Sequence, residues 1–426
     1  MIKVFIESND LFQSEVRYIW TIFAINKGIK YSFVDNKEGC DISIGSDSDN
    51  TIQVSNEFYK MIWDAKYYHT FHFKDRPLIE DNGKPDYLST AFFMINCIQE
   101  INHSKLDEFN RFPYTESYQY KFNCVTKNLV QEYFDKLYDS LEILRNIPVK
   151  KTKTSILLTH DIDVIYGSLL QDSFQLLKKG KIFSFTEMIL KNISSYPYWL
   201  NLIEIMDIEA SYGFKSTFFW LVNKGKVSDI LSNSDYNINN SKVRATMKEI
   251  EKRGFYNGLH KSASDTGFDD ELRTLNIPNT VSNRYHYLKF TPSIDFKKIQ
   301  DGGIKLDSTL GFAEEYGFRN SYGLPFRPYN LKERKAYNFV ECPLNIMDTT
   351  FHFYKKTGAL EAYNLTEKFI LDNQNYCVLA MLIHNPYFTE YKFKSYRNFA
   401  IKTFELMKRQ GIRTITQQEI IDTYLI

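Results

Sequence analysis

The sequence has few of the features that characterise disulfide-rich, zinc-ribbon and nucleic-acid-binding proteins. It contains only five cysteines in 426 residues, and no two of them have C-x-x-C spacing. Its 53 basic and 52 acidic side chains leave a net charge of +1, which argues against a protein built mainly to bind nucleic acid or an anionic membrane. We therefore expect reduced cysteines, no disulfide framework and no structural zinc site.

Long apolar runs are also absent. The first residues, MIKVFIESNDLFQ, lack the apolar core of a signal peptide. No stretch approaches the roughly 18 consecutive apolar residues of a transmembrane helix. We expect a cytoplasmic protein with no membrane span, in which the short basic run Lys178-Lys179-Gly180-Lys181 lies on the solvated surface.

Aromatic residues are plentiful, at 16% of the chain. Such rings fill large cores, and they also line sugar-binding clefts. The length of the chain favours two or three domains. The strand pattern of Ile2–Ile6 and the helical stretch after it predict a small α/β domain over residues 1–125. A connecting helix and linker are expected at 126–153, and a larger domain at 154–426.

The larger domain alternates short apolar runs with helical patterns. This alternation is typical of parallel strands with right-handed crossovers, which form either a barrel or an open α/β sheet. The expected strands lie at residues 156–158, 216–221, 255–259, 280–284, 337–344, 377–383 and 414–415.

Ionisable side chains stand at the end of the first of these strands. Side chains alternate along a strand, so Asp161 and Asp163 share one face and His160 points the other way. Two carboxylates on one face stay charged only when a cation lies between them, and otherwise one takes a proton. The pair therefore indicates a metal site or an acid/base pair, although it could also cap the next helix or a turn.

Three further strand ends carry similar residues. His260 ends one strand, Arg284 and His286 end the next, and His384 follows the strand near the carboxyl terminus. Parallel neighbouring strands bring such ends together, and active sites are built there. A single histidine at a strand end is more often a packing residue, but the coincidence of several favours function.

These residues carry a resemblance to a known family. The segments Thr159-His160-Asp161-Ile162-Asp163, Lys215–Phe219, Gly258-Leu259-His260, Arg284–Tyr287 and Ile383-His384 occur in the order of the motifs of the polysaccharide deacetylase family, or NodB homology domain. The first segment resembles a divergent H-D-[VI]-D variant of that family. The amino-terminal part is similar to an uncharacterised domain that often precedes this variant.

The resemblance implies a distorted (β/α)7 barrel that removes an acetyl group from an N-acetylated sugar or glycan precursor with the help of a divalent metal, expected to be zinc. Asp161 matches the catalytic base, Arg284 the side chain that holds it, and His384 the general acid. Asp163 and His260 match metal ligands, Asp163 less closely because Ile162 separates it from Asp161.

One departure bears on the metal. The family has a second histidine where this chain has Ser264, and catalytic metal sites usually supply three protein ligands. His286 could supply the missing nitrogen or could replace a proline of the family motif, and we expect the ligand role. Three more residues belong either to the substrate wall or to internal ion pairs: Asp307, Arg319 and Asp348.

Two functional readings follow, with a third as a variant. The first is a metal-dependent deacetylase of an N-acetylated glycan. The second is a non-catalytic glycan-binding or scaffolding protein with a degenerate metal site. A general acid placed opposite a base serves no purpose in pure binding, so the residue set favours the enzyme. The same chemistry on a non-sugar amide is the variant.

Overall fold

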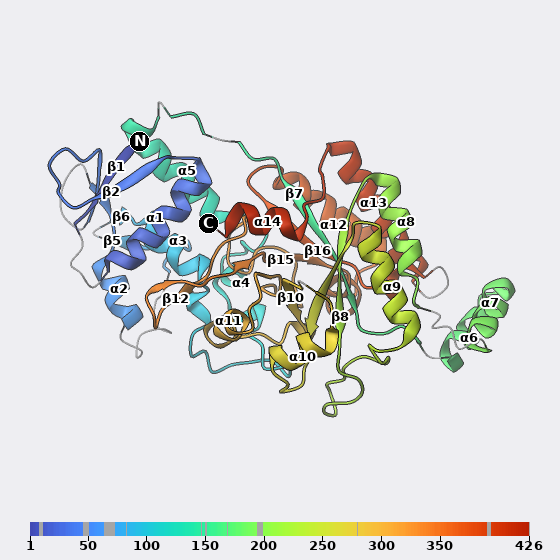
Figure 1. Ribbon diagram of the computed structural model, residues 1–426. Helices are drawn as coiled ribbons and strands as arrows, with labels where there is room; N and C mark the ends of the chain where they lie inside the picture. The colour runs from blue at the N-terminus through green and yellow to red at the C-terminus, as the bar shows by residue number, and fades with distance from the viewer. Residues whose placement is uncertain are drawn as a thin grey trace.

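The computed structural model describes residues 1–7, 12–45, 51–63, 73–81, 83–145, 147–149, 151–167, 169–193, 199–278, 280–389 and 393–425. A small sheet lies at the amino-terminal end of the molecule and a larger sheet lies at its centre (Figure 1). None of the helices in the described part of the chain combines the length and hydropathy needed to traverse a bilayer.

The small sheet has four parallel strands in the order β2-β1-β3-β4. Alternate side chains of β1 are buried, as expected for a strand with one covered face. These strands are β1 (Ile2–Ile6), β2 (Tyr31–Val34), β3 (Ile42–Gly45) and β4 (Thr51–Gln53).

Helices cover this sheet with aromatic side chains. Trp20 and Phe23 of the helix between β1 and β2 are fully buried, and Phe23 packs edge-on against Phe134. This helix ends at Gly28, whose φ of 70° suits a left-handed cap. The helices of the amino-terminal part are α1 (Gln13–Lys27), α2 (Asn56–Trp63), α3 (Tyr87–Ile95), α4 (Tyr118–Lys121) and α5 (Leu129–Ser140).

The large sheet has eight strands, all parallel, in the order β14-β11-β10-β9-β8-β7-β16-β15. Every residue of β7, β8 and β16 is buried, which is typical of strands covered on both faces. The strands are β7 (Ser155–Ile162), β8 (Ser216–Leu221), β9 (Tyr256–Lys261), β10 (Ser282–Tyr285), β11 (Leu306–Asp307), β14 (Val340–Glu341), β15 (Leu344–Met347) and β16 (Val378–Leu382).

The two ends of this sheet meet. Only Cys342 and Pro343 separate β14 from β15, although these strands lie at opposite ends of the strand order. The Leu344 amide donates to the Leu310 carbonyl, just after β11, at 3.0 Å. Gly311 fits beside this junction because a Cβ there would lie 2.7 Å from the Leu344 oxygen. The sheet is therefore strongly curled, as in a distorted barrel, although β14 and β15 do not pair with each other.

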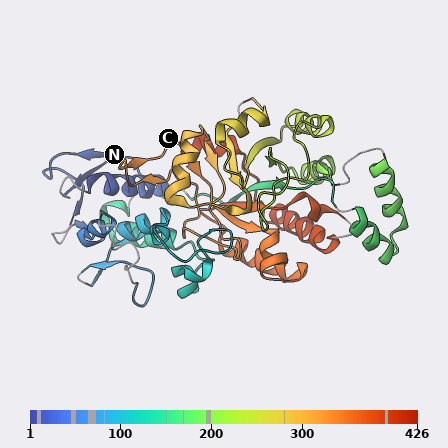
Figure 2. The same ribbon diagram turned by 90° about the horizontal axis from the view of Figure 1, so that it is seen from below.

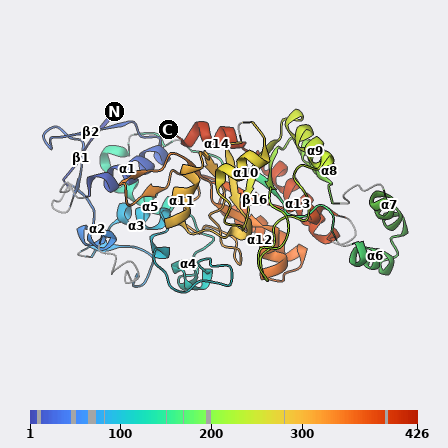
Figure 3. The same cartoon turned by 60° about the horizontal axis from the view of Figure 1, so that its bottom comes forward.

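Helices surround the barrel strands, as Figure 2 shows. They bury one apolar side each, for example Leu202, Ile205 and Met206 of α8. These helices are α8 (Leu202–Tyr212), α9 (Ser241–Lys252), α10 (Phe268–Leu275), α11 (Pro292–Asp301), α12 (Ala359–Asp372), α13 (Lys394–Gln410) and α14 (Gln417–Tyr424). Two more, α6 (Leu169–Lys178) and α7 (Ile182–Ile193), form a hairpin that stands apart from the barrel (Figures 1 and 3).

The expected fold class is confirmed, because a parallel α/β barrel follows a small α/β sheet, and the curled sheet is consistent with a distorted (β/α)7 barrel. Two strand predictions were wrong in detail. The run 337–344 contains β14 and the start of β15, because the chain crosses there between the two ends of the sheet. The run 414–415 contributes only an isolated bridge from Thr414 to Ile156.

A buried ion pair joins the amino-terminal part to the barrel part. The Arg319 guanidinium donates to both carboxylate oxygens of Glu100, at 2.9 and 2.6 Å. Both side chains are almost fully buried. Of the two roles open to Arg319 from sequence, the structure shows the internal ion pair. The core is also continuous, since apolar side chains of both parts belong to one cluster.

Candidate metal centre

The ionisable residues at the strand ends gather at one edge of the barrel. Asp161 lies near the end of β7, Asp163 directly follows that strand, His260 lies near the end of β9, and His286 follows β10. Parallel pairing sets Arg284 opposite His260, so the carboxyl ends of β9 and β10 are level. The convergence that the sequence predicted is therefore present in the structure.

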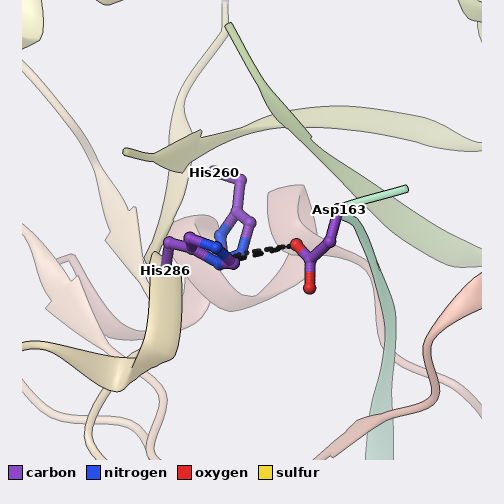
Figure 4. A group of neighbouring side chains, drawn as sticks. All are labelled: Asp163, His260 and His286. Atoms are coloured by element: carbon purple, nitrogen blue, oxygen red, sulfur yellow. Dashed lines mark hydrogen bonds and ion pairs between the residues drawn. The ribbon is translucent and has the colours of Figure 1, made fainter. Parts of the chain in front are cut away.

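Three of these side chains form a compact cluster (Figure 4). His260 Nε2 lies 3.3 Å from Asp163 Oδ1, and His286 Nδ1 lies 3.5 Å from the same oxygen. The two ring nitrogens are 3.1 Å apart. One ligand atom from each residue lies within 4.8 Å of the other two, which is close enough for one ion to contact all three.

In each histidine, the ring nitrogen that points away from the cluster makes a hydrogen bond, and this bond determines whether the inner nitrogen carries a lone pair. His260 Nδ1 is 2.9 Å from the Arg284 carbonyl, and His286 Nε2 is 3.0 Å from the Ser232 carbonyl. A carbonyl can only accept, so both outer nitrogens carry hydrogen. In the neutral rings each inner nitrogen then carries a lone pair that points into the cluster, as in histidines that bind a metal.

The Asp163 carboxylate is also suited to bind a cation. Among the described residues, Asp163 Oδ1 is a buried oxygen that accepts no hydrogen bond. A buried carboxylate oxygen without a donor is costly unless a cation lies nearby. Two imidazole nitrogens and one carboxylate oxygen are a donor set that zinc accepts, with a position left for water or substrate. The residues therefore fit a divalent cation.

The pKa values agree with this assignment of charge. Burial lowers the pKa of His286 to about 4, against the opposing effect of Asp163, so this ring is neutral at pH 7. Burial also disfavours a charged His260, but Asp161 and Asp163 outweigh it and raise its pKa. The nearby histidines lower the pKa of Asp163 although burial opposes them. The cluster therefore holds an ionised carboxylate and at least one neutral imidazole.

Arg284 holds Asp161 at the side of the cluster. The guanidinium is fully buried and donates to Asp161 Oδ1 at 3.0 Å and to Thr159 Oγ1 at 2.8 Å. Its other nitrogens donate to the carbonyl and hydroxyl oxygens of Ser308, at 2.7 and 3.0 Å. Asp161 Oδ2 lies 3.6 Å from His260 Nε2. One oxygen of Asp161 is thus fixed by Arg284, and the other faces the cluster.

His384 also lies beside the cluster, with its Nε2 3.6 Å from Asp163 Oδ2. Its Nδ1 lies 2.7 Å from Asp348 Oδ1, and its backbone amide donates to Asp348 Oδ2 at 2.6 Å. Burial would lower the pKa of His384, but Asp348, Asp163 and Asp161 outweigh it and raise the pKa to about 10. His384 is therefore a protonated donor that faces the cluster.

The role of Asp348 is one that sequence reasoning left open. It follows β15, which pairs with β16 directly before His384, so the partnership depends on which strands are neighbours. Asp307 proves to be an internal residue, bound by the Asn283 amide at 2.6 Å and by the Thr309 backbone amide at 3.0 Å.

Two other residues of the motifs lie away from the cluster. His160 is buried between the Ile383 carbonyl and the Glu209 carboxylate, at 2.6 and 2.7 Å, and stacks on Phe218. The Ser264 hydroxyl accepts a hydrogen bond from the Asn233 amide at 2.7 Å, in another cavity. The structure thus places His286, and not Ser264, beside His260.

A cavity of about 240 Å³ opens over the cluster. Its lining includes two residues of the amino-terminal part, which no sequence motif connected with the strand ends. The remaining lining is largely aromatic and apolar. The residues are Phe109, Arg111, Asp161, Asp163, His260, Tyr285, His286, Tyr287, Leu288, Ala313, Met347, Thr349, Phe353, Tyr354, Leu382 and His384.

Comparisons with known proteins give two kinds of likeness. Residues 4–145 match the model of a family of unknown function, DUF7033. No curated protein matches the chain. A putative polysaccharide deacetylase from Mycobacterium smegmatis aligns with a TM-score of 0.40 and 10% identity, over 64% of this chain and 90% of that one. The polysaccharide deacetylase Bc1974 from Bacillus cereus aligns with a TM-score of 0.29 and 12% identity, over 62% and 93%.

A third solved structure is a mutant of BA3943, a CE4 family pseudoenzyme with restored enzymatic activity. It aligns with a TM-score of 0.32 and 13% identity, over 67% of this chain and 75% of that one.

Proposed function

We propose that this protein is a metal-dependent hydrolase that removes an acetyl group from an N-acetylated sugar. The observation that carries the proposal is the cluster of Asp163, His260 and His286. The two inner ring nitrogens and the carboxylate oxygen Asp163 Oδ1 lie close together. Among the described residues, no hydrogen-bond donor pairs with this buried oxygen. The ordered motifs of the sequence support the same reaction.

The cluster would hold the cation through Asp163, His260 and His286. A bound divalent cation would polarise the amide carbonyl and lower the pKa of water. Asp161, with one oxygen fixed by Arg284, takes a proton from the attacking water on its other oxygen. The oxygen of that water forms a bond to the carbonyl carbon of the amide.

His384 completes the reaction on the leaving side. Its Nε2–H donates a proton to the amide nitrogen as the carbon–nitrogen bond breaks, which releases the amine and acetate. Asp348 keeps the Nδ1–H in place and so orients the ring. Amide hydrolysis requires both a base for the attacking water and an acid for the leaving amine, and Asp161 and His384 would supply them beside the same cluster.

The contrasting reading is a glycan-binding protein with a degenerate metal site. It followed from Ser264, which supplies no imidazole. The position of His286 weighs against it, because this ring supplies a second nitrogen from a different strand. A hydrolase of a non-sugar amide would use the same residues, and the choice of substrate in the assay separates the two.

Calorimetric zinc titration tests the metal site, and acetate release from an N-acetylglucosamine oligomer tests the activity. We expect His286→Ala to weaken zinc binding by more than the roughly 10–100-fold that loss of an outer-shell partner costs. Ser264→His should leave zinc affinity unchanged, because position 264 lies in another cavity. Native zinc affinity in His286→Ala, together with a gain in Ser264→His, would favour the degenerate site.

A further inference from the structure

The α6–α7 hairpin, residues 169–193, has no part in the proposed chemistry and little contact with the rest of the molecule. It follows β7 by way of Gly167, and the chain returns to the body at Trp199, whose amide donates to the Ile165 carbonyl at 2.8 Å. The hairpin thus leaves the edge of the barrel at which the cavity opens. Figure 3 shows both helices standing away from the barrel.

The two helices pack on each other through a small core of their own. Leu176 of α6 and Met188 of α7 are buried together, with Phe185 and Ile189 packed against them. Gly180, with a φ of 65°, makes the turn between the helices. One side of α7 is therefore accounted for by its contact with α6.

The other side of α7 is apolar as well. Successive residues of a helix are 100° apart, so Ile182, Phe183, Leu190 and Ile193 fall on one face. Phe183 is 82% exposed and Ile193 is 75% exposed. On α6, Phe174 and Leu177 are three positions apart and are also mostly exposed. A helix that is apolar on two sides is covered by something on both.

The charge at the tip of the hairpin indicates what covers it. Lys178 and Lys179 are exposed and Lys181 is partly exposed, directly beside Leu177, Ile182 and Phe183. The described acidic side chains of the hairpin are Asp172, which is buried, and Glu187, which follows Phe183 by one turn of α7. Lysines outnumber acidic residues in the sequence of residues 169–193, so the hairpin is basic on balance. Apolar and basic side chains side by side are the pattern of helices that lie in the surface of an anionic bilayer.

We propose that the outer face of α6 and α7 docks on the surface of an anionic phospholipid bilayer. With 12 residues, α7 is about 18 Å long, which is too short to span the roughly 30 Å hydrocarbon core but long enough to lie within the interface. A two-fold contact between copies at the tip would instead bring like-charged lysines together. The docking would set the cavity beside the membrane, and it does not depend on the proposed reaction.

Sedimentation with lipid vesicles tests the inference on the full chain. We expect binding to vesicles of phosphatidylcholine and phosphatidylglycerol in equal parts, little binding to phosphatidylcholine alone, and weaker binding at high salt. Phe183→Ser should weaken binding about tenfold. Lys178→Gln, Lys179→Gln and Lys181→Gln together should weaken it by on the order of a hundredfold.

Leu360→Ser is the matched control, because Leu360 is another exposed apolar side chain, at 64%, on a helix of the barrel body. It should bind as the native chain does, and circular dichroism should show native folding for all variants. Absence of binding to the anionic vesicles, or equal binding by Phe183→Ser, would overturn the proposal. A dimer in sedimentation velocity that Phe183→Ser dissociates, without vesicle binding, would assign the face to a contact between copies.

Discussion

The Arg111 guanidinium donates to the Tyr287 carbonyl at 2.7 Å, across 176 residues of sequence. Tyr287 and the next residue, Leu288, have φ values of 58° and 51°, in the left-handed region that bulky side chains rarely adopt. Phe109 stacks on the Tyr287 ring with centroids 5.3 Å apart. The amino-terminal part thus clamps a strained backbone next to His286, a residue of the metal cluster.

This clamp predicts that the amino-terminal part influences the metal site. The Arg111 guanidinium also donates to the Asp107 carboxylate at 2.7 Å, and this hydrogen bond fixes its orientation toward Tyr287. Arg111→Ala should relax the backbone at Tyr287 and lower zinc affinity by roughly 10–100-fold, as expected for a residue that acts through a ligand. Calorimetric zinc titration measures the effect, and thermal unfolding of the metal-free proteins reports any loss of stability.

Arg111→Lys provides the matched comparison, because lysine keeps the charge but cannot reach Asp107 and Tyr287 with a planar fork. We expect it to recover only part of the affinity. Native zinc binding in Arg111→Ala would show that the barrel alone maintains the left-handed turn.

The general acid can be separated from the metal ligands. His384→Gln should lower turnover by roughly 10²–10⁴-fold while the zinc content remains unchanged, because His384 meets the cluster as a donor. Asp348→Asn should also lower turnover, since the His384 ring loses the carboxylate that orients it. Zinc analysis of the purified variants decides the point. Loss of zinc from His384→Gln would make His384 a ligand.

A buried carboxyl pair should make stability fall as the pH rises. Asp307 and Glu341 are register partners on β11 and β14, and burial raises the pKa of both, with the charge of Asp307 adding to the effect on Glu341. A carboxyl whose pKa is raised by folding stabilises the folded state fully below its ordinary pKa, which is about 3.9 for aspartate and about 4.3 for glutamate. This stabilisation is lost as the pH rises through the raised pKa. Each unit by which folding raises the pKa corresponds to about 1.4 kcal/mol of stabilisation at low pH.

Glu341→Gln removes one charge and keeps the shape. Its free energy of unfolding, measured by urea denaturation from acid to alkaline pH, should decline less with rising pH than that of the native chain. The same slope for both proteins would mean that another group causes the decline.

Removal of one partner of the buried Glu100–Arg319 ion pair should strongly destabilise the folded state. Glu100→Leu leaves the guanidinium without its partner and should cost about 3–5 kcal/mol of unfolding free energy. The double variant Glu100→Leu, Arg319→Met leaves no buried charge and should be clearly more stable than the single variant. Urea denaturation measures both. A double variant as unstable as the single one would assign the cost to packing.

The sequence alone determined the architecture and the edge at which the site lies. Apolar runs in alternation with helical patterns specify parallel strands, and parallel strands place their carboxyl ends together. This is why Asp161, Asp163, His260, Arg284 and His384 could be selected before their positions were known. Alternation along β7 likewise predicted that His160 would point away from Asp161, as it does.

Only the tertiary structure decided which side chains meet. The sequence named His286 as the expected third ligand, but the strained turn at Tyr287 beside it, and the Arg111 side chain that clamps this turn, have no local sequence pattern. Asp348 orients His384 because β15 and β16 are neighbours. Arg319 pairs with Glu100 of the amino-terminal part and not with Asp307. Such contacts depend on the packing of residues far apart in the chain, and periodicity and spacing report only on neighbours.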